Sequence, residues 1–262
     1  MNVRNDLQRD KELMLARWLY SLENEGLSEN TVKTYHRGAA ALLSYYCDTP
    51  PGAITPRDIR DWVRDLKEDL APATINTRLS GVRSFYDWYS PESNPAEDVP
   101  NVEEPQHRPK ALKRGEYKRL LRAARLHGDA RDQAIIEFML GTGVRVSELL
   151  DVKIKDLKIN ERSGSVVIRN GKGGKLREIP LPLETRKALE KYLAEEHPKP
   201  REKEAYLWNG QRGRLRDPST ISRILDKYAY HARIEEISPH VLRNTYATRY
   251  RSEEHTSELQ SP

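Results

Sequence analysis

The sequence predicts a mainly helical protein of the α+β class, with two helical domains and a small antiparallel sheet in the second one. Three observations favour this fold class. Apolar residues recur at helical spacing over most of the chain, which is typical of amphipathic helices. Five prolines fall between residues 91 and 109, where this spacing stops. Two short apolar runs flank a glycine-rich turn at 170–175, which is the pattern of a β-hairpin.

Composition limits the kinds of protein that this chain can be. Its 262 residues can form two modest cores, and 37% hydrophobic with 32% charged residues indicates a soluble protein without an apolar run long enough to cross a bilayer. The first residues lead into a charged helix and carry no secretory signal, so we expect a cytoplasmic protein. Cys47 is the only cysteine, which excludes an internal disulfide and a cysteine-based metal cluster. The net charge of +5 suits a polyanionic partner.

Residues 1–90 are predicted to form a compact domain of four short helices. Each helix is indicated by an apolar stripe and by a start or stop signal, namely a glycine at its end or a serine or threonine at its beginning. The predicted helices cover residues 7–25, which Gly26 closes, residues from Ser28 onward, residues from Thr55 onward, and residues 73–89.

The polar face of the fourth predicted helix carries Asn76, Arg78 and Arg83. These side chains fall outside the stripe that includes Ile75 and Leu79, so we expect them on a solvent face. They are either simply hydrated or in contact with phosphates. The helical spacing then stops, and we interpret residues 91–109 as a stiff extended linker and the boundary between the two domains.

The second domain is predicted to alternate helices with the hairpin. Glycine ends and serine or aspartate caps again mark the boundaries. The expected helices cover residues 114–126, an apolar run from Asp129 to Gly141, residues from Arg145 onward, residues 184–196, residues from Asp217 onward and residues from Ser238 onward; the expected strands cover 165–169 and 176–180.

The densest basic cluster of the chain is formed by Arg212, Arg214, Arg216 and Arg223. A protein that clamps a nucleic-acid duplex needs such side chains for contacts with the phosphate backbone, which give affinity and position without reading the sequence. We therefore predict DNA contacts here as well as at Arg78 and Arg83.

The last predicted helix has the features of a phosphate site at its start. Ser238 can cap the helix, Pro239 suits its first position, and His240 and Arg243 lie three residues apart on one face. A helix start favours an anion, and a guanidinium fork beside a titratable ring suits a phosphoryl oxygen that gains charge. The pair alone is weak support, because an arginine near a helix start is often only solvated or salt-bridged.

Two further motifs occur upstream of this pair. Arg145 and Glu148 lie three apart after the turn G-T-G-V, and Lys172 lies at the tip of the predicted hairpin. The ordered motifs G-T-G-x-R-x-S-E-L-L, G-K-G-x-K-x-R-x-I-P-L and H-x-L-R-x-T-x-A-T resemble the catalytic domain of the tyrosine recombinases, the phage-integrase and Xer-type family. Three motifs in the same order over more than a hundred residues are a specific signal, and the resemblance extends more loosely over the amino-terminal half.

This resemblance implies a SAM-like core-binding domain that clamps DNA, followed by a catalytic domain over residues 110–250. It implies transesterification at a DNA phosphodiester through a 3′-phosphotyrosyl intermediate, without cofactor or metal. Arg145 and Arg243 would grip the non-bridging oxygens, Lys172 would protonate the leaving 5′-oxygen, and His240 would assist proton transfer at the nucleophile. Glu148 would orient Arg145. Double-stranded DNA is the implied partner, and family members act as homo-tetramers on synapsed DNA.

The chain departs from the family pattern after Arg243, where the family has its nucleophilic tyrosine well downstream. Tyr246 and Tyr250 belong to the same predicted helix as the arginine, so we assign no nucleophile in this chain. Residues 251–262 lack an apolar period and resemble a translated adapter, and we interpret them as a non-native tail after a truncation. Two alternatives stay open at this point: a non-catalytic DNA-binding protein that kept the fold, and a type IB topoisomerase.

Overall fold

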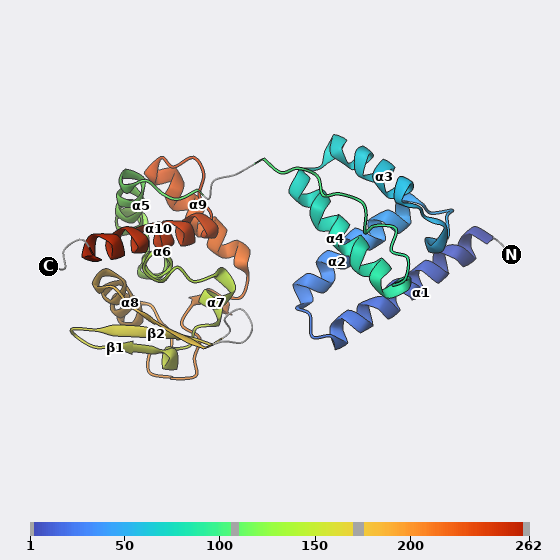
Figure 1. Cartoon of the computed structure of the whole chain (residues 1–262). Coiled ribbons are helices and arrows are strands. Elements are labelled where there is room, and N and C mark those ends of the chain that lie inside the picture. Colours follow the sequence, from blue (N-terminus) through green and yellow to red (C-terminus); the bar gives the residue numbers. More distant parts are fainter. Residues whose placement is uncertain (1–2, 106–109, 170–175, 259–262) are drawn as a thin grey trace. The chain divides into compact units, whose positions relative to one another are not determined.

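The computed structural model describes residues 3–105, 110–169 and 176–258, and the chain divides into two compact units, Met1–Gln106 and His107–Pro262 (Figure 1). Both units are mainly helical, and strands occur in the second one. This agrees with the predicted α+β class. In the part of the chain that the structure describes, every helix is too short or too polar to cross a membrane.

The first unit consists of four helices whose starts follow the predicted capping signals. Ser28 accepts a hydrogen bond from the Thr31 amide at 3.2 Å, and Thr55 and Asp58 cap each other's backbone amides. The helices are α1 (Val3–Asn24), α2 (Glu29–Tyr45), α3 (Pro56–Asp69) and α4 (Pro72–Tyr89), with a short turn of 3₁₀ helix, η1 (Pro51–Ala53), before α3. Local capping chemistry therefore sets the boundaries that the sequence predicts.

Helices α2 and α4 cross with their backbones in contact. A Cβ atom added at Gly38 would lie 2.3 Å from the carbonyl oxygen of Arg78, and one added at Gly81 would lie 2.3 Å from that of Tyr35. Since real side chains do not tolerate such distances, each helix uses a glycine where the other one passes. This close crossing brings buried residues of the two helices, such as Leu42 and Leu79, into one core.

The segment after α4 differs from the predicted linker. Ala96 and Val99 are buried in the core of the first unit, and Arg83 donates hydrogen bonds to both of their carbonyl groups. Asn76 likewise bonds to both backbone groups of Val102. The prediction of an extended linker is therefore wrong for this part of residues 91–109, because it packs on α4; residues 106–109 lie outside the described ones. The predicted solvent-facing position of Arg83 and Asn76 is wrong for the same reason.

The second unit contains six helices and five strands within its described residues. A three-stranded antiparallel sheet, in the order β1-β2-β3, extends the predicted hairpin by one strand. The helices are α5 (Arg114–His127), α6 (Ala130–Thr142), α7 (Val146–Asp151), α8 (Leu183–Glu195), α9 (Pro218–Ala232) and α10 (Pro239–Glu258); the strands are β1 (Leu157–Ile159), β2 (Gly164–Ile168), β3 (Arg177–Pro180), β4 (Asn209–Gly210) and β5 (Gly213–Arg214). A 3₁₀ turn, η2 (Ile154–Asp156), precedes β1.

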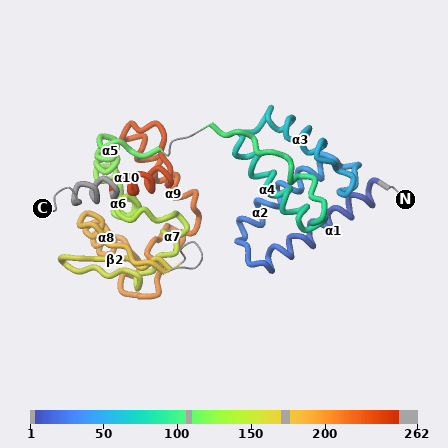
Figure 2. Tube along the Cα trace, in the orientation of Figure 1, coloured from blue at the N-terminus to red at the C-terminus, as the bar shows by residue number. Residues whose placement is uncertain are grey.

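Helix α6 lies in the middle of the second unit and packs against α5, α8 and α10 (Figures 1 and 2). Its residues are buried on almost every side, as the continuous apolar run predicts. Phe138 of α6 packs edge-on against Trp208, which stacks on Tyr192 of α8. The sheet contributes Val166 and Ile168 to the same core, so the ends of β2 and β3 are fixed close to α7.

Candidate phosphate-binding site

The start of α10 has the predicted capping geometry. Ser238 accepts a hydrogen bond from the Val241 amide at 3.3 Å, and Pro239 is the first helical residue. His240 is exposed in the first turn, and Arg243 is half-buried one turn later. Both side chains therefore lie at a helix end where backbone amides and the helix dipole favour an anion.

The turn between α6 and α7 depends on Gly143. Its φ angle is +60°, and a Cβ atom there would lie 2.3 Å from the ring of Tyr246 on α10. The left-handed conformation ends α6 and turns the chain so that Arg145 caps α7. The carbonyl oxygen of Gly143 accepts a hydrogen bond from Nη1 of Arg243. One glycine thus links the two segments that carry the predicted catalytic arginines.

Arg145, His240 and Arg243 line a single cavity of about 430 Å³ between the α6–α7 turn and the start of α10. The predicted convergence of these three residues is therefore present. Burial lowers the pKa of Arg243, and the nearby guanidinium of Arg145 lowers it further. Cations that repel each other in this way are stabilised by an anion between them. Lys172 lies outside the described residues, so its predicted place in the site stays a prediction.

Glu148 lies beside Arg145 and is buried, with 2% of its side chain exposed. It accepts hydrogen bonds from the Arg145 amide at 2.8 Å and from Nη1 of Arg145 at 3.0 Å. The predicted contact between Glu148 and Arg145 is thus present. Burial alone would raise the pKa of Glu148, but hydrogen bonds from Arg177 and from Arg145 outweigh it and hold the pKa below its usual value.

Arg177 is the residue of this cluster that sequence reasoning did not single out. Its Nη1 and Nη2 donate to the two carboxylate oxygens of Glu148 at 3.0 and 2.7 Å, in a bidentate arrangement. Arg177 is the arginine of the motif G-K-G-x-K-x-R-x-I-P-L, but the motif does not show that this arginine meets Glu148. We call Arg145, Glu148, Arg177 and Arg243 the arginine cluster.

Comparison with known proteins identifies the family. The sequence profile of the Phage integrase family matches residues 110–260, and that of the Phage integrase N-terminal SAM-like domain matches residues 14–93. This chain belongs to the phage integrase family. Its amino-terminal unit is therefore the SAM-like domain that the sequence predicts, and the arginine cluster lies in the integrase domain.

Relatives with curated names are tyrosine recombinases. XerC of Myxococcus xanthus is 31% identical over 252 residues, which cover 90% of this chain and 83% of that protein. XerA of Pyrococcus furiosus is 31% identical over 247 residues, which cover 92% of this chain and 82% of that protein. This phage integrase family chain is thus a tyrosine recombinase by family, and neither alternative, a non-catalytic DNA-binding protein nor a topoisomerase, is favoured.

Solved structures confirm the fold. A lambda integrase dimer bound to a COC′ core site aligns with a TM-score of 0.73 at 18% identity, covering 92% of this chain and 70% of that one. XerH bound to difH in a pre-cleavage complex aligns with a TM-score of 0.72 at 18% identity, covering 93% of this chain and 84% of that one. The two-part helical architecture is therefore that of the integrase family.

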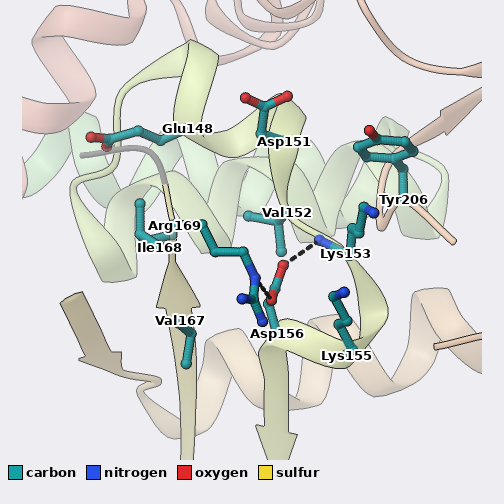
Figure 3. Close-up of a pocket in the computed structure, with 10 residues that line it drawn as sticks. All are labelled: Glu148, Asp151, Val152, Lys153, Lys155, Asp156, Val167, Ile168, Arg169 and Tyr206. Carbon is teal, nitrogen blue, oxygen red and sulfur yellow. Dashed lines mark hydrogen bonds and ion pairs between the residues drawn. The ribbon is translucent and has the colours of Figure 1, made fainter. Parts of the chain in front are cut away.

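A second charged cavity, of about 170 Å³, lies beside the arginine cluster between η2 and the end of β2 (Figure 3). Asp156, with 2% of its side chain exposed, accepts hydrogen bonds from the Lys153 amide at 3.0 Å and from Arg169 at 2.5 Å. Lys153 and Lys155 pair with Glu204 at 3.1 and 2.7 Å. We call this the lysine cavity, and each of its cations has a carboxylate partner.

The predicted DNA-contact residues of this integrase domain differ in their surroundings. Arg212 and Arg216 are exposed, and Arg223 is exposed beside Asp217 at 3.6 Å. Arg214 is half-buried: it donates to Asp151 at 2.6 Å and its guanidinium lies 3.3 Å from the ring centre of Tyr206. A structural role explains its position.

Two further predictions concern nucleophiles and metals. Tyr246 packs under Gly143 and lines a different cavity, together with Glu137 and Thr185, in agreement with the prediction that it is an aromatic packing residue. Side chains from residue 250 onward lie outside the described ones, so the non-native tail stays a prediction. Among the described residues, His, Cys, Asp and Glu side chains form no group of three that could hold a metal ion.

Proposed function

We propose that Arg145, His240 and Arg243 hold the scissile phosphate of a DNA duplex during site-specific strand exchange. The observation that carries this proposal is that three side chains, from segments almost a hundred residues apart, line one cavity in which cations exceed carboxylates. A phosphodiester has the size and charge to occupy such a site. It would relieve the repulsion between the two guanidiniums.

The chemistry would be two transesterifications. A tyrosine hydroxyl attacks phosphorus, the bond from phosphorus to the 5′-oxygen breaks, and the tyrosine becomes joined to the 3′-phosphate. A 5′-hydroxyl from another strand then attacks the same phosphorus and releases the tyrosine. Arg145 and Arg243 would stabilise the charge on the non-bridging oxygens, because preorganised donors act most strongly in a partly dehydrated site.

Proton transfer would be divided between two residues. His240 is exposed at the cavity and would accept the proton of the attacking hydroxyl, while Lys172, by its place in the family motif, would protonate the leaving 5′-oxygen. In the described part of the chain, no tyrosine lines this cavity. We therefore predict that the chain as given binds DNA but forms no phosphotyrosyl adduct with a nicked suicide duplex.

Duplex DNA is the proposed partner, and a tetramer on two duplexes is the proposed assembly. One solved neighbour is a lambda integrase tetramer bound to a Holliday junction, which aligns with a TM-score of 0.72 at 20% identity. The exposed Arg212, Arg216 and Arg223 and the half-buried Arg78 remain the proposed backbone contacts, whereas Arg83 and Arg214 have protein partners. Such a DNA-acting protein would work in the cytoplasm, as the sequence predicts.

The test compares duplex binding by Arg145→Ala, Arg243→Ala and the matched control Arg122→Ala, an exposed arginine on α5. The two site variants should bind about tenfold more weakly, and each should lower the slope of log affinity against log salt by about one, because one phosphate contact is lost. The control should leave both quantities unchanged. Equal behaviour of all three variants would contradict the assignment of the phosphate site.

A further inference from the structure

Arg177 is a charged residue on the core-facing side of a strand. It opposes Ile168 in the register of β2 and β3, and residues opposite each other in an antiparallel pair point to the same face. Ile168 is buried, and so is Ile179 two positions along β3. A guanidinium on this face must find a partner, and the side chain of Glu148 is that partner.

The carboxylate of Glu148 has its hydrogen-bonding capacity filled. Oε1 accepts from Nη1 of Arg145 and from Nη1 of Arg177, and Oε2 accepts from the Arg145 amide and from Nη2 of Arg177. Arg177 therefore uses two nitrogens and Arg145 only one nitrogen of its guanidinium. In the described part of the chain, Nε and Nη2 of Arg145 make no hydrogen bond to protein, and 45% of that side chain is exposed.

We propose that Arg177 is a positioning residue: by occupying one side of the Glu148 carboxylate it limits Arg145 to a single supporting bond and leaves the other donors of Arg145 for the phosphate. The proposal rests on the function proposed above, because the ligand for the remaining donors of Arg145 is the phosphate proposed there. Without Arg177, a buried carboxylate would retain one guanidinium as its partner. Arg145 would then turn to satisfy both oxygens and withdraw its donors from the cavity.

The position of Arg177 at the start of β3 also connects the Glu148 carboxylate to the β2–β3 hairpin. Arg177 starts β3 and lies close to Lys172 in the sequence, so the carboxylate that supports Arg145 also fixes the β3 stem of the β2–β3 hairpin. The other stem is fixed separately, by the bond from Arg169 to Asp156. The hairpin therefore offers a matched pair of arginines, of which only Arg177 contacts the support of Arg145.

The first measurement follows Arg145 directly. Heteronuclear NMR of the arginine Nε–Hε groups gives one signal for Arg145, which is identified by its loss in Arg145→Lys. Arg177→Gln should shift and broaden that signal. Arg177→Lys should shift it less, because lysine keeps the positive charge but lacks the two parallel donors of a guanidinium. Arg169→Gln should leave the signal in place. If Arg177→Gln unfolds, as a thermal melt would reveal, the signal in Arg177→Lys decides.

The second measurement is a double-mutant cycle on binding of a short fluorescent DNA duplex. Arg145→Ala should weaken binding about tenfold in the wild-type background and less than about twofold in the Arg177→Gln background, because there Arg145 no longer reaches the phosphate. A role of Arg177 in stability alone would leave the effect of Arg145→Ala the same in both backgrounds.

Two results would overturn the inference. One is an Arg145 signal that stays in place in Arg177→Gln together with an undiminished effect of Arg145→Ala in that background. The other is an equal shift in Arg169→Gln, which would mean that any loosening of the hairpin disturbs Arg145. A shift specific to Arg177→Gln, with no effect of Arg145→Ala on wild-type binding, would support the positioning role and instead contradict the proposed phosphate site.

Discussion

The arginine cluster and the lysine cavity are neighbouring groups of charged side chains that differ in their ratio of cations to carboxylates. In the arginine cluster, Arg145 and Arg177 share the carboxylate of Glu148, and burial together with these two guanidiniums lowers the pKa of Arg243. In the lysine cavity, each of the three cations pairs with Asp156 or with Glu204. The carboxylates of Glu148 and Asp151 line this cavity too (Figure 3). The residues that line the lysine cavity thus include three cations and three carboxylates, whereas the arginine cluster has three cations and one carboxylate.

This difference shows what marks a phosphate site in a highly charged protein. Both groups contain basic side chains, and each has a buried carboxylate that accepts a backbone amide at a helix start: Glu148 at the start of α7 and Asp156 at the start of η2. The number of cations alone would not distinguish them. The ratio of cations to carboxylates does. It is three to one in the arginine cluster and three to three among the residues that line the lysine cavity, where each cation already has a carboxylate partner.

Replacement of Gly143 by alanine should have the largest effect on the arginine cluster. The left-handed backbone and the ring of Tyr246, 2.3 Å from the new Cβ, both oppose a side chain, so we expect a loss of about 3 kcal/mol in the free energy of unfolding. Gly213→Ala is the matched control, since φ is +97° but no atom lies within 4 Å. It should cost about 1 kcal/mol. Urea denaturation measures both, and equal losses would contradict the proposed contact.

Neutralising the buried carboxylates of Glu148 and Asp156 should affect the free energy of unfolding in both cases but DNA binding in only one. Glu148→Gln and Asp156→Asn should each cost about 3 kcal/mol of unfolding free energy, because each leaves buried donors without their charged partner. Only Glu148→Gln should also weaken duplex binding, by about tenfold, since Arg145 loses its support. Fluorescence anisotropy under conditions where both variants are folded provides the check. A comparable binding defect in Asp156→Asn would remove the distinction between the two clusters.

Neutralising the lysine cavity should change DNA binding little. Lys155→Ala breaks the ion pair with Glu204, and we expect less than about a twofold change in duplex affinity with an unchanged salt slope, because the lost charge was already compensated. Titrations at several salt concentrations test this. A slope lowered as much as in Arg243→Ala would mean that the lysine cavity also contacts phosphates.

The acid dependence of stability should differ between two buried carboxylates. The pKa of Glu148 lies below 4.5, so its stabilising contribution is present above pH 4.5 and is lost as the pH falls through the lower folded value. Burial raises the pKa of Glu137 above 4.5 despite its bond to Arg125, so its contribution has the opposite sign. Glu137→Gln should therefore be neutral or slightly stabilising at pH 7, by less than about 1 kcal/mol, as thermal melts across pH would show.

Features determined by neighbouring residues could be predicted from the sequence. Caps at Ser28, Thr55 and Ser238 form because a side chain bonds to an amide three residues away, so both partners belong to one short stretch of sequence. The convergence of Arg145, His240 and Arg243 was predicted from the family resemblance, since nothing local shows that these segments meet.

Features determined by distant packing could not be predicted in this way. Helical spacing shows that Arg83 leaves the apolar stripe of α4, but not that residues 96–101 return to cover it. Arg214 was assigned to a basic surface because its sequence neighbours are basic, whereas the fold brings Asp151 and Tyr206 to it. The link between Arg177 and Glu148 spans 29 positions, and no local pattern indicates it.

The glycine crossing of α2 and α4 limits how this domain could be redesigned for new DNA targets. Arg78, a proposed DNA contact, is one position to randomise, yet its own carbonyl is the atom that Gly38 accommodates. Libraries that vary the outer face of α4 should therefore keep Gly38 and Gly81 fixed, so that selected changes in target preference come from new side chains and not from a shifted helix pair.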